Sequence, residues 1–182
     1  MSEMGGHLVL VGMMGVGKST VGRIVADRMQ RPFFDSDAEV ERRCKRSIPA
    51  VFATNGEAAF RSYEREAVCC LLASRVPAVI SLGGGAVIDP ETRRRLGSGN
   101  VVVWLELSAD ALALRLGDGA GRPLIEGDPV GALRRLDAMR RPIYRNLAAV
   151  AVPAGSRSAP VVAEAVLRAA LGRLKGPCGA SR

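Results

Sequence analysis

The chain has 182 residues, 48% of them apolar, and a formal net charge of +8 with a pI near 10.2. This length predicts one domain that buries its own core without metal or disulfide staples. No apolar run approaches the roughly 20 residues of a bilayer span, and four cysteines without C-x-x-C spacing, with no signal peptide before them, predict free thiols in a cytoplasmic protein.

Five short runs rich in β-branched, leucine or aromatic residues alternate with longer segments of helical character. The predicted strands are 8–11, 33–34, 78–80, 101–105 and 148–152. The predicted helices are one with Val21, Ile24, Val25 and Met29 on a single face, then 38–44, 49–53, 56–73, 90–96, a helix capped by Ser108 that ends at Leu116, 129–145 and 159–174. The aromatic pair 33–34 is expected to end a buried strand.

This alternation predicts an α/β fold, a three-layer α-β-α sandwich with a five-stranded parallel sheet. We expect a single domain over residues 1–175 and a disordered tail over 176–182. Ligands of such sheets bind beyond the carboxyl ends of the strands. Gly12, Asp35 and Gly83 follow the first three strands and should therefore share one rim.

Arginine dominates the positive charge, with 23 Arg against 3 Lys. Nucleic-acid binding is one explanation of such a charge. However, the arginines are scattered, and only 4% of residues are aromatic, which leaves few platforms for base stacking. We therefore expect a protein that handles small anions, with no nucleic-acid or membrane partner.

Residues 12–19 read GMMGVGKS, which fits GxxxxGK(S/T) between a strand and a helix. Backbone N–H groups and the helix N-terminus can converge on phosphate oxygens there, Lys18 can reach the β- and γ-phosphates, and the Ser19 hydroxyl can ligate Mg²⁺. The motif predicts a nucleoside triphosphate with one Mg²⁺ ion, but GTPases, motor ATPases, helicases and small-molecule kinases all carry it. The expected nucleotide contacts here are Gly15, Val16, Gly17, Lys18, Ser19 and Thr20.

Two carboxylates follow the second strand in the stretch FFDSD. Residues 35 and 37 are two apart, so on an extended chain their side chains point the same way. Asp35, nearer the cradle, can orient the water shell of Mg²⁺. Asp37, further out, can accept hydrogen bonds from substrate hydroxyls and take a proton. The alternative is that Asp37 only caps the helix that follows.

Several arginines and a glycine run also fit an anionic ligand. Guanidinium groups match carboxylates bidentately, although Arg61 and Arg140 each fit a solvated helix charge when taken alone. Arg122 ends a Gly-rich stretch, and such a segment can cover a γ-phosphate or be a plain surface loop. The residues of the glycine run, Gly83, Gly84 and Gly85, leave backbone amides open to a flat ring.

Six segments in this order resemble the shikimate kinase family: GMMGVGKST (12–20), FFDSD (33–37), SIPAVFATNGEAAFRSYE (47–64), SLGGGAV (81–87), GRPL (121–124) and RRPIY (140–144). The resemblance runs from about Leu8 to Arg173. It implies a P-loop kinase with a mobile lid over 117–127 that uses ATP and Mg²⁺ to phosphorylate the 3-hydroxyl of shikimate, in aromatic amino-acid biosynthesis. It also implies a monomer.

The resemblance assigns a role to each candidate. Asp37 would be the general base, Lys18 and Arg122 would act on the phosphates, and Asp35 with Ser19 would hold Mg²⁺. The shikimate carboxylate would lie between Arg61, supported by Glu64, and Arg140, and its ring would lie against the glycine run. The pattern R-x-P-x-Y selects Arg140 and leaves Arg141 as a surface charge. The residues that would flank the adenine are Arg115 and Arg157, although SRSAPVV around Arg157 departs from the commoner Asn-containing pattern.

Two other hypotheses remain open from the residues. A gluconate kinase or a nucleoside monophosphate kinase would also fit a pocket with one Asp and two Arg, although the glycine run and R-x-P-x-Y favour shikimate. A non-enzymatic P-loop module that binds nucleic acid would explain the basic charge but leaves D-x-D and Arg122 unexplained.

Overall fold

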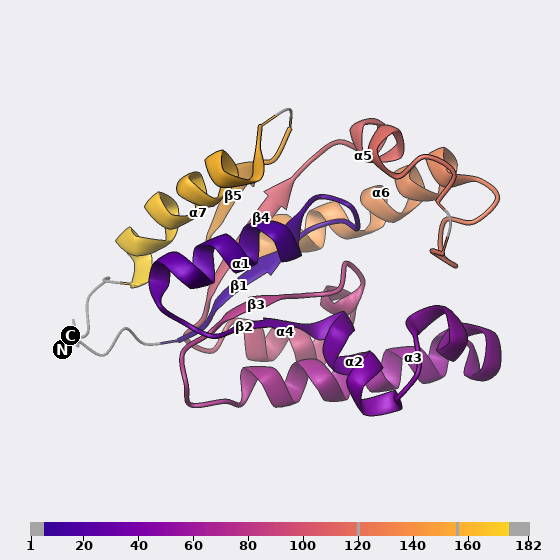
Figure 1. Cartoon of the computed structure of the whole chain (residues 1–182), viewed down its shortest axis with the longest axis horizontal. Helices are drawn as coiled ribbons and strands as arrows, with labels where there is room; N and C mark the ends of the chain where they lie inside the picture. Colours follow the sequence, from indigo (N-terminus) through magenta and orange to yellow (C-terminus); the bar gives the residue numbers. More distant parts are fainter. Residues whose placement is uncertain (1–5, 120, 156, 175–182) are drawn as a thin grey trace.

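The computed structural model describes residues 6–119, 121–155 and 157–174, in which five parallel strands form one sheet with helices on both faces (Figure 1). The strands are β1 (Leu8–Val11), β2 (Phe33–Asp35), β3 (Val79–Ser81), β4 (Val101–Glu106) and β5 (Val150–Pro153), in the order β2-β3-β1-β4-β5. The helices are α1 (Lys18–Met29), α2 (Ser36–Cys44), α3 (Ile48–Leu72), the short 3₁₀-helix η1 (Ala86–Ile88), α4 (Pro90–Leu96), α5 (Ala109–Leu116), α6 (Pro129–Leu147) and α7 (Ala159–Leu174). The predicted α/β class and five-stranded parallel sheet are confirmed.

The strand order brings three predicted site segments together. β3 pairs with both β1 and β2, and Ser81 is opposite Leu10 on one side and Asp35 on the other. The carboxyl ends of these three strands are therefore neighbours. Gly12, Asp35 and Gly83 share one rim, as predicted.

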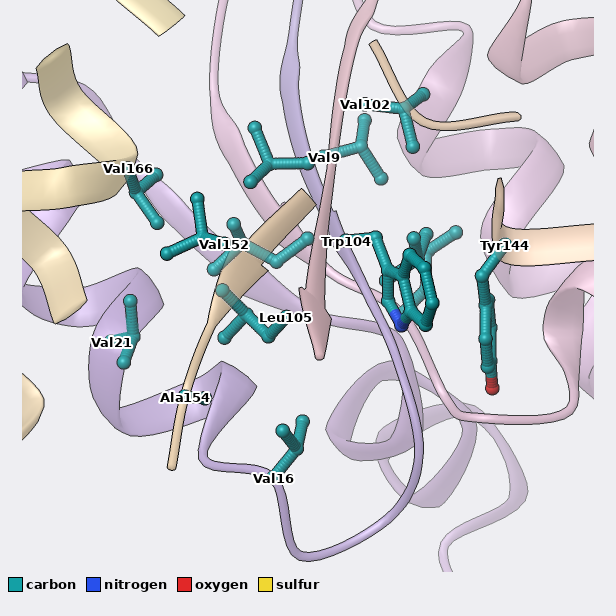
Figure 2. Close-up of a cluster of buried hydrophobic side chains, with 14 of the residues drawn as sticks. Val9, Val16, Val21, Val102, Trp104, Leu105, Tyr144, Val152, Ala154 and Val166 are labelled. Carbon is teal, nitrogen blue, oxygen red and sulfur yellow. The ribbon is translucent and has the colours of Figure 1, made fainter. Parts of the chain in front are cut away.

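The central strands β1 and β4 build the core because they are buried on both faces. All four residues of β1 are at most 1% exposed, which suits a parallel strand covered by helices on both sides. Side chains alternate across each strand: Leu105 of β4 lies on the side of α1 and α7, whereas Trp104 stacks on Tyr144 of α6 (Figure 2). α1 and α7 thus cover one face, and α6 covers the other.

β2 differs from the expectation of a buried strand. It lies at the edge of the sheet, and Phe34 is 40% exposed. Phe33 is half-buried and has the Arg23 guanidinium over its ring. The aromatic pair suggested a buried strand because aromatic residues favour strands in general, but edge strands keep one side in water.

Helix boundaries follow the predictions closely, with one merger. The segments 49–53 and 56–73 are joined in α3, and the join is a kink at Gly56, whose φ of 77° is non-helical. The Ser108 Oγ accepts a hydrogen bond from the Ala111 N–H at 3.3 Å, which confirms the predicted N-cap. No described helix is long and apolar enough to span a bilayer. The tail predicted for 176–182 lies outside the described residues.

α2 and α3 have a small core of their own. Val40, Val51, Phe60 and Ala67 form a buried cluster separate from the main core. This cluster packs the two helices together beyond the rim of the sheet (Figure 1). It holds α2 and α3 together as one unit that faces the loop between α5 and α6.

Candidate active site

The loop between β1 and α1 forms a phosphate cradle. Gly17 precedes α1 with a φ of 101°, a value that only glycine adopts without strain. Lys18 opens the helix and folds its side chain back, with Nζ donating to the carbonyls of Gly12 at 2.8 Å and Met13 at 3.0 Å. The N–H groups of the first turn of α1 remain directed at the space in front of the loop.

The ammonium of Lys18 is buried. Burial lowers its pKa to about 8, although the charges of Asp37 and Asp35 act in the opposite direction. A desolvated cation of this kind is stabilised by a further anion, so a bound phosphate would raise this pKa again.

Asp35 links the cradle to α2. Its Oδ2 accepts a hydrogen bond from Ser19 Oγ at 2.5 Å, while its Oδ1 accepts from the N–H groups of Asp37 at 3.0 Å and Ala38 at 3.4 Å. Asp35, and not Asp37, is therefore the N-cap of α2. The expectation of an extended chain between the two aspartates is wrong, because α2 begins at Ser36.

Ser19 and Asp35 together fit a magnesium ion. A hydroxyl and a carboxylate oxygen beside a phosphate cradle are the hard oxygen donors that Mg²⁺ prefers, and the ion takes its other ligands from water and phosphate. No cluster of three or more His, Cys, Asp or Glu residues among the described residues could hold a metal by itself. Such a cluster is unnecessary for a nucleotide-bound Mg²⁺.

Asp37 lies in the first turn of α2 and faces the glycine run. Its Oδ1 is buried and has no hydrogen-bond partner among the described residues. Burial, followed by the negative charges of Asp35 and Glu64, raises the pKa of Asp37 to about 6. A Cβ added at Gly83 would lie 2.4 Å from this oxygen, so glycine is required there for the carboxylate to fit. A carboxylate with a pKa near neutrality suits a general base.

Arg61 projects from α3 and is held by two carboxylates. Its Nη1 donates to Glu64 at 2.7 Å, as predicted from their spacing, and its Nη2 donates to Glu57 at 2.9 Å. A Cβ at Gly85 would lie 2.3 Å from Arg61 Nη1. The side chain is therefore fixed against the glycine run, with 26% of it exposed.

Arg140 is the most unusual residue of the site. It is 1% exposed, and both Nε and Nη1 lack a hydrogen-bond partner in the described part of the chain. Burial lowers its pKa. A buried guanidinium with free donors favours an anionic ligand, since an uncompensated buried charge is costly.

Arg141 faces away from this site. It pairs with Asp137 at 2.9 Å and with Glu106 at 2.5 Å, and it lies over the Trp104 ring. The structure therefore brings Arg140, rather than Arg141, to the glycine run. Arg141 is partly exposed, outside the cavity lining, and its charge is paired with these two carboxylates.

Asp37, Arg61, Arg140 and the glycine run line one cavity of about 430 Å³, which lies between the cradle, α2, α3 and the loop after α5. Phe52 and Phe60, with ring centroids 4.7 Å apart, form an apolar wall. The sequence reasoning missed Glu41, which also lines the cavity and could have been found from its position one turn after Asp37 on α2. The full lining is Met14, Asp37, Glu41, Ile48, Pro49, Phe52, Phe60, Arg61, Glu64, Gly83, Gly84, Gly85, Gly121, Arg122, Pro123, Leu124 and Arg140.

The three remaining arginines occupy different places. Arg122 is exposed and lines the cavity from the loop predicted to be a lid. Arg115 donates to the carbonyls of Val16 at 3.5 Å and Ala154 at 3.0 Å, and also to that of Gly155, so it ties the cradle to the loop after β5. Arg157 is exposed beyond this loop and is not part of the cavity lining.

The cradle and the cavity share a wall, because a Cβ at Gly84 would lie only 3.3 Å from the backbone of Gly12 and Met14. A phosphate donor and a small acceptor can therefore meet at Asp37, and this arrangement defines a P-loop kinase for small molecules. The family model for shikimate kinase matches residues 14–171, and the chain belongs to the shikimate kinase family.

Individual relatives agree with this placement. The shikimate kinase of Thermobifida fusca (strain YX) is 41% identical over 160 residues, which are 88% of this chain and 92% of the relative. That of Thiobacillus denitrificans is 42% identical over 171 residues, covering 93% of this chain and 92% of the relative.

Solved structures include one that is similar to this chain in both sequence and fold, and one that shares only the fold. A shikimate kinase from Acinetobacter baumannii, in complex with shikimate, superposes with a TM-score of 0.88 at 33% identity, covering 92% of this chain and 94% of that one. A gluconokinase from Sinorhizobium meliloti reaches a TM-score of 0.57 at 20% identity over 93% of both chains, which indicates a shared fold alone.

Proposed function

We propose that this chain transfers the γ-phosphoryl group of ATP to the 3-hydroxyl of shikimate, giving shikimate 3-phosphate and ADP. The observation that carries the proposal is that a carboxylate and a guanidinium group with unused hydrogen-bonding atoms lie at the same cavity. Asp37 and Arg140 both line this cavity, and among the described residues Asp37 Oδ1 and the Arg140 nitrogens Nε and Nη1 are buried without a hydrogen-bond partner. A ligand with both a hydroxyl and a carboxylate would satisfy all three.

Asp37 would act as the base. The hydroxyl oxygen forms a bond to the γ-phosphorus as the bond to the β-phosphate bridging oxygen breaks, and the hydroxyl proton passes to Asp37. The pKa of about 6 leaves Asp37 ionised at neutral pH and still basic enough to accept the proton.

Arg140 and Arg61 would hold the substrate carboxylate. Arg140 has free donors, and Glu57 with Glu64 fixes the direction of Arg61. Two guanidinium groups on one carboxylate provide strong, directional, charge-assisted hydrogen bonds. The apolar wall of Phe52 and Phe60 would lie along the carbocyclic ring.

The cradle would hold the triphosphate through the backbone of residues 15–20 and the Lys18 ammonium. Ser19 and Asp35 would hold one Mg²⁺ ion, which when bound neutralises charge on the phosphates. Arg122, on the loop over the cavity, would reach the transferring group and exclude water when the loop closes. Arg115 and Arg157 would lie near the adenine. We further propose that the enzyme acts as a cytoplasmic monomer.

The test is an ADP-release assay with shikimate, gluconate, nucleoside monophosphates or no acceptor, each with ATP and Mg²⁺. We expect ADP release that depends on shikimate and is near the background rate with the other acceptors. Equal release without an acceptor would indicate a hydrolase, and preference for gluconate would indicate a gluconate kinase instead.

A further inference from the structure

The glycine run Gly83–Gly85 is held by side chains from two other elements. The Gly83 N–H donates to Ser36 Oγ of α2 at 2.8 Å, and Tyr144 of α6 donates its hydroxyl to the Gly84 carbonyl at 2.5 Å. Ser36 and Tyr144 are both 0% exposed. Neither residue lines the acceptor cavity, so neither is positioned to contact the acceptor itself.

These two bonds decide which backbone donors remain free. The Gly83 N–H is used by Ser36, and the Gly83 carbonyl accepts from the Ala86 N–H at 3.1 Å. The N–H groups of Gly84 and Gly85 have no hydrogen-bond partner among the described residues. Since a trans peptide directs its C=O and N–H in opposite directions, the bond from Tyr144 to the Gly84 carbonyl also fixes the direction of the Gly85 N–H.

The same two residues connect the run to the charged groups of the cavity. Ser36 stands between Asp35 and Asp37, so its bond sets the distance from the base to the glycine run. Tyr144 is one helical turn after Arg140 on α6, so its bond sets the distance from that guanidinium to the same run.

We propose that Ser36 and Tyr144 are positioning residues for acceptor recognition, which fix the glycine run relative to Asp37 and Arg140. This inference rests on the proposed function, because it requires an acceptor that contacts the run. Without the two bonds, the Gly84 and Gly85 amides would move relative to the base and the guanidinium, and the acceptor would lose its simultaneous contacts.

The Tyr144 hydroxyl can be removed without removing its ring. The ring stacks on Trp104 with centroids 6.0 Å apart (Figure 2). Phenylalanine keeps that packing, so Tyr144→Phe removes only the hydroxyl. Its bond to the Gly84 carbonyl, its 3.9 Å contact with Met13 Sδ and its interaction with the Arg140 guanidinium are lost together. Ser36→Ala deletes the other bond but leaves the Gly83 N–H buried and unpaired, so we expect its effect to be larger.

The experiment measures the dissociation constants of shikimate and ADP by calorimetry, together with steady-state turnover and melting temperature. We expect Tyr144→Phe to weaken shikimate binding about three- to tenfold with ADP binding unchanged. Ser36→Ala should weaken shikimate binding and also lower kcat, because it frees the turn that carries the base. The matched controls are Tyr63→Phe, an exposed tyrosine, and Ser108→Ala, whose hydroxyl accepts from a backbone N–H away from the cavity.

Each outcome decides the matter. Unchanged shikimate affinity in both variants overturns the inference, even if the melting temperature falls, because the residues would then support only the fold. Equal losses of shikimate and ADP affinity overturn it as well, since they indicate general loosening. An unmodified chain that binds no shikimate overturns the proposed function first, and the inference with it.

Discussion

The phosphate cradle and the acceptor cavity are neighbours built in opposite ways. The cradle comes from one continuous segment, residues 12–20, and offers mainly backbone N–H groups and one lysine. The cavity gathers Asp37, Arg61, the glycine run and Arg140 from four segments that are spread over about 100 residues of the chain. The cradle thus carries chemistry common to many kinases, whereas the cavity carries the groups that choose the acceptor.

The largest expected effect comes from Asp37→Asn, which should impair the acceptor cavity and leave the phosphate cradle unchanged. Asp37→Asn keeps the shape of the side chain but removes the base, so kcat should fall about 10²- to 10⁴-fold. The affinity for ATP should be unchanged, because the cradle is intact. A matching loss of ATP affinity, measured by calorimetry, would show that the two regions are not independent.

Arg61→Lys tests the carboxylate side of the cavity. Lysine keeps the charge but cannot keep two directed contacts, so the KM for shikimate should rise about tenfold or more with the KM for ATP unchanged. Arg141→Lys is the matched control, because Arg141 faces away from the cavity. Equal effects of the two substitutions would remove Arg61 from substrate binding.

The pH dependence of turnover tests whether Asp37 acts as a base, and its expected effect is smaller. The raised pKa of Asp37 means that this carboxylate is protonated below about pH 6. kcat/KM for shikimate should therefore fall about tenfold for each pH unit below that value. A flat profile down to pH 5 would mean that Asp37 only orients the hydroxyl.

The smallest effect concerns the opposite end of the sheet and separates stability from catalysis. His7 is buried, accepts a hydrogen bond from the Ala78 N–H at 3.2 Å and lies 3.1 Å from the Ser74 carbonyl. Burial lowers its pKa below the ordinary value of 6.5. Its contribution to stability is therefore complete above pH 6.5 and is lost as the pH falls below that value.

Chemical denaturation of the unmodified chain and His7→Asn should show this effect. The difference in unfolding free energy between the two should shrink between pH 7.5 and pH 5. A difference independent of pH would mean that His7 titrates alike in the folded and unfolded chains. The comparison also shows whether acid loss of turnover arises at Asp37 or from unfolding.

Local patterns made the cradle and most helices predictable from the sequence. GxxxxGK(S/T) specifies its own backbone. Ser108 marks a helix start through a bond within one turn, and Pro90 marks another because its fixed φ suits the first helical position. The rim of Gly12, Asp35 and Gly83 followed from the general rule for parallel sheets.

The failures all involve contacts that sequence spacing does not encode. The exposure of Phe34 depends on β2 lying at the edge of the sheet, which no local pattern specifies. The capping role of Asp35 depends on where α2 begins. Ser36 and Tyr144 lie in the segments FFDSD and RRPIY, but their bonds to the glycine run could not be predicted, because their partners lie 47 and 60 residues away in the chain.

The buried guanidinium of Arg140 also implies a trade-off between the stability of the fold and the activity. Two nitrogens of this desolvated charge, Nε and Nη1, have no hydrogen-bond partner among the described residues, so a bound ligand would contribute part of the stability of the folded chain. An apolar side chain of similar volume would pack there without that penalty. Selection for heat resistance alone would therefore replace Arg140, and an enzyme optimised in that way would lose its acceptor site while becoming harder to unfold.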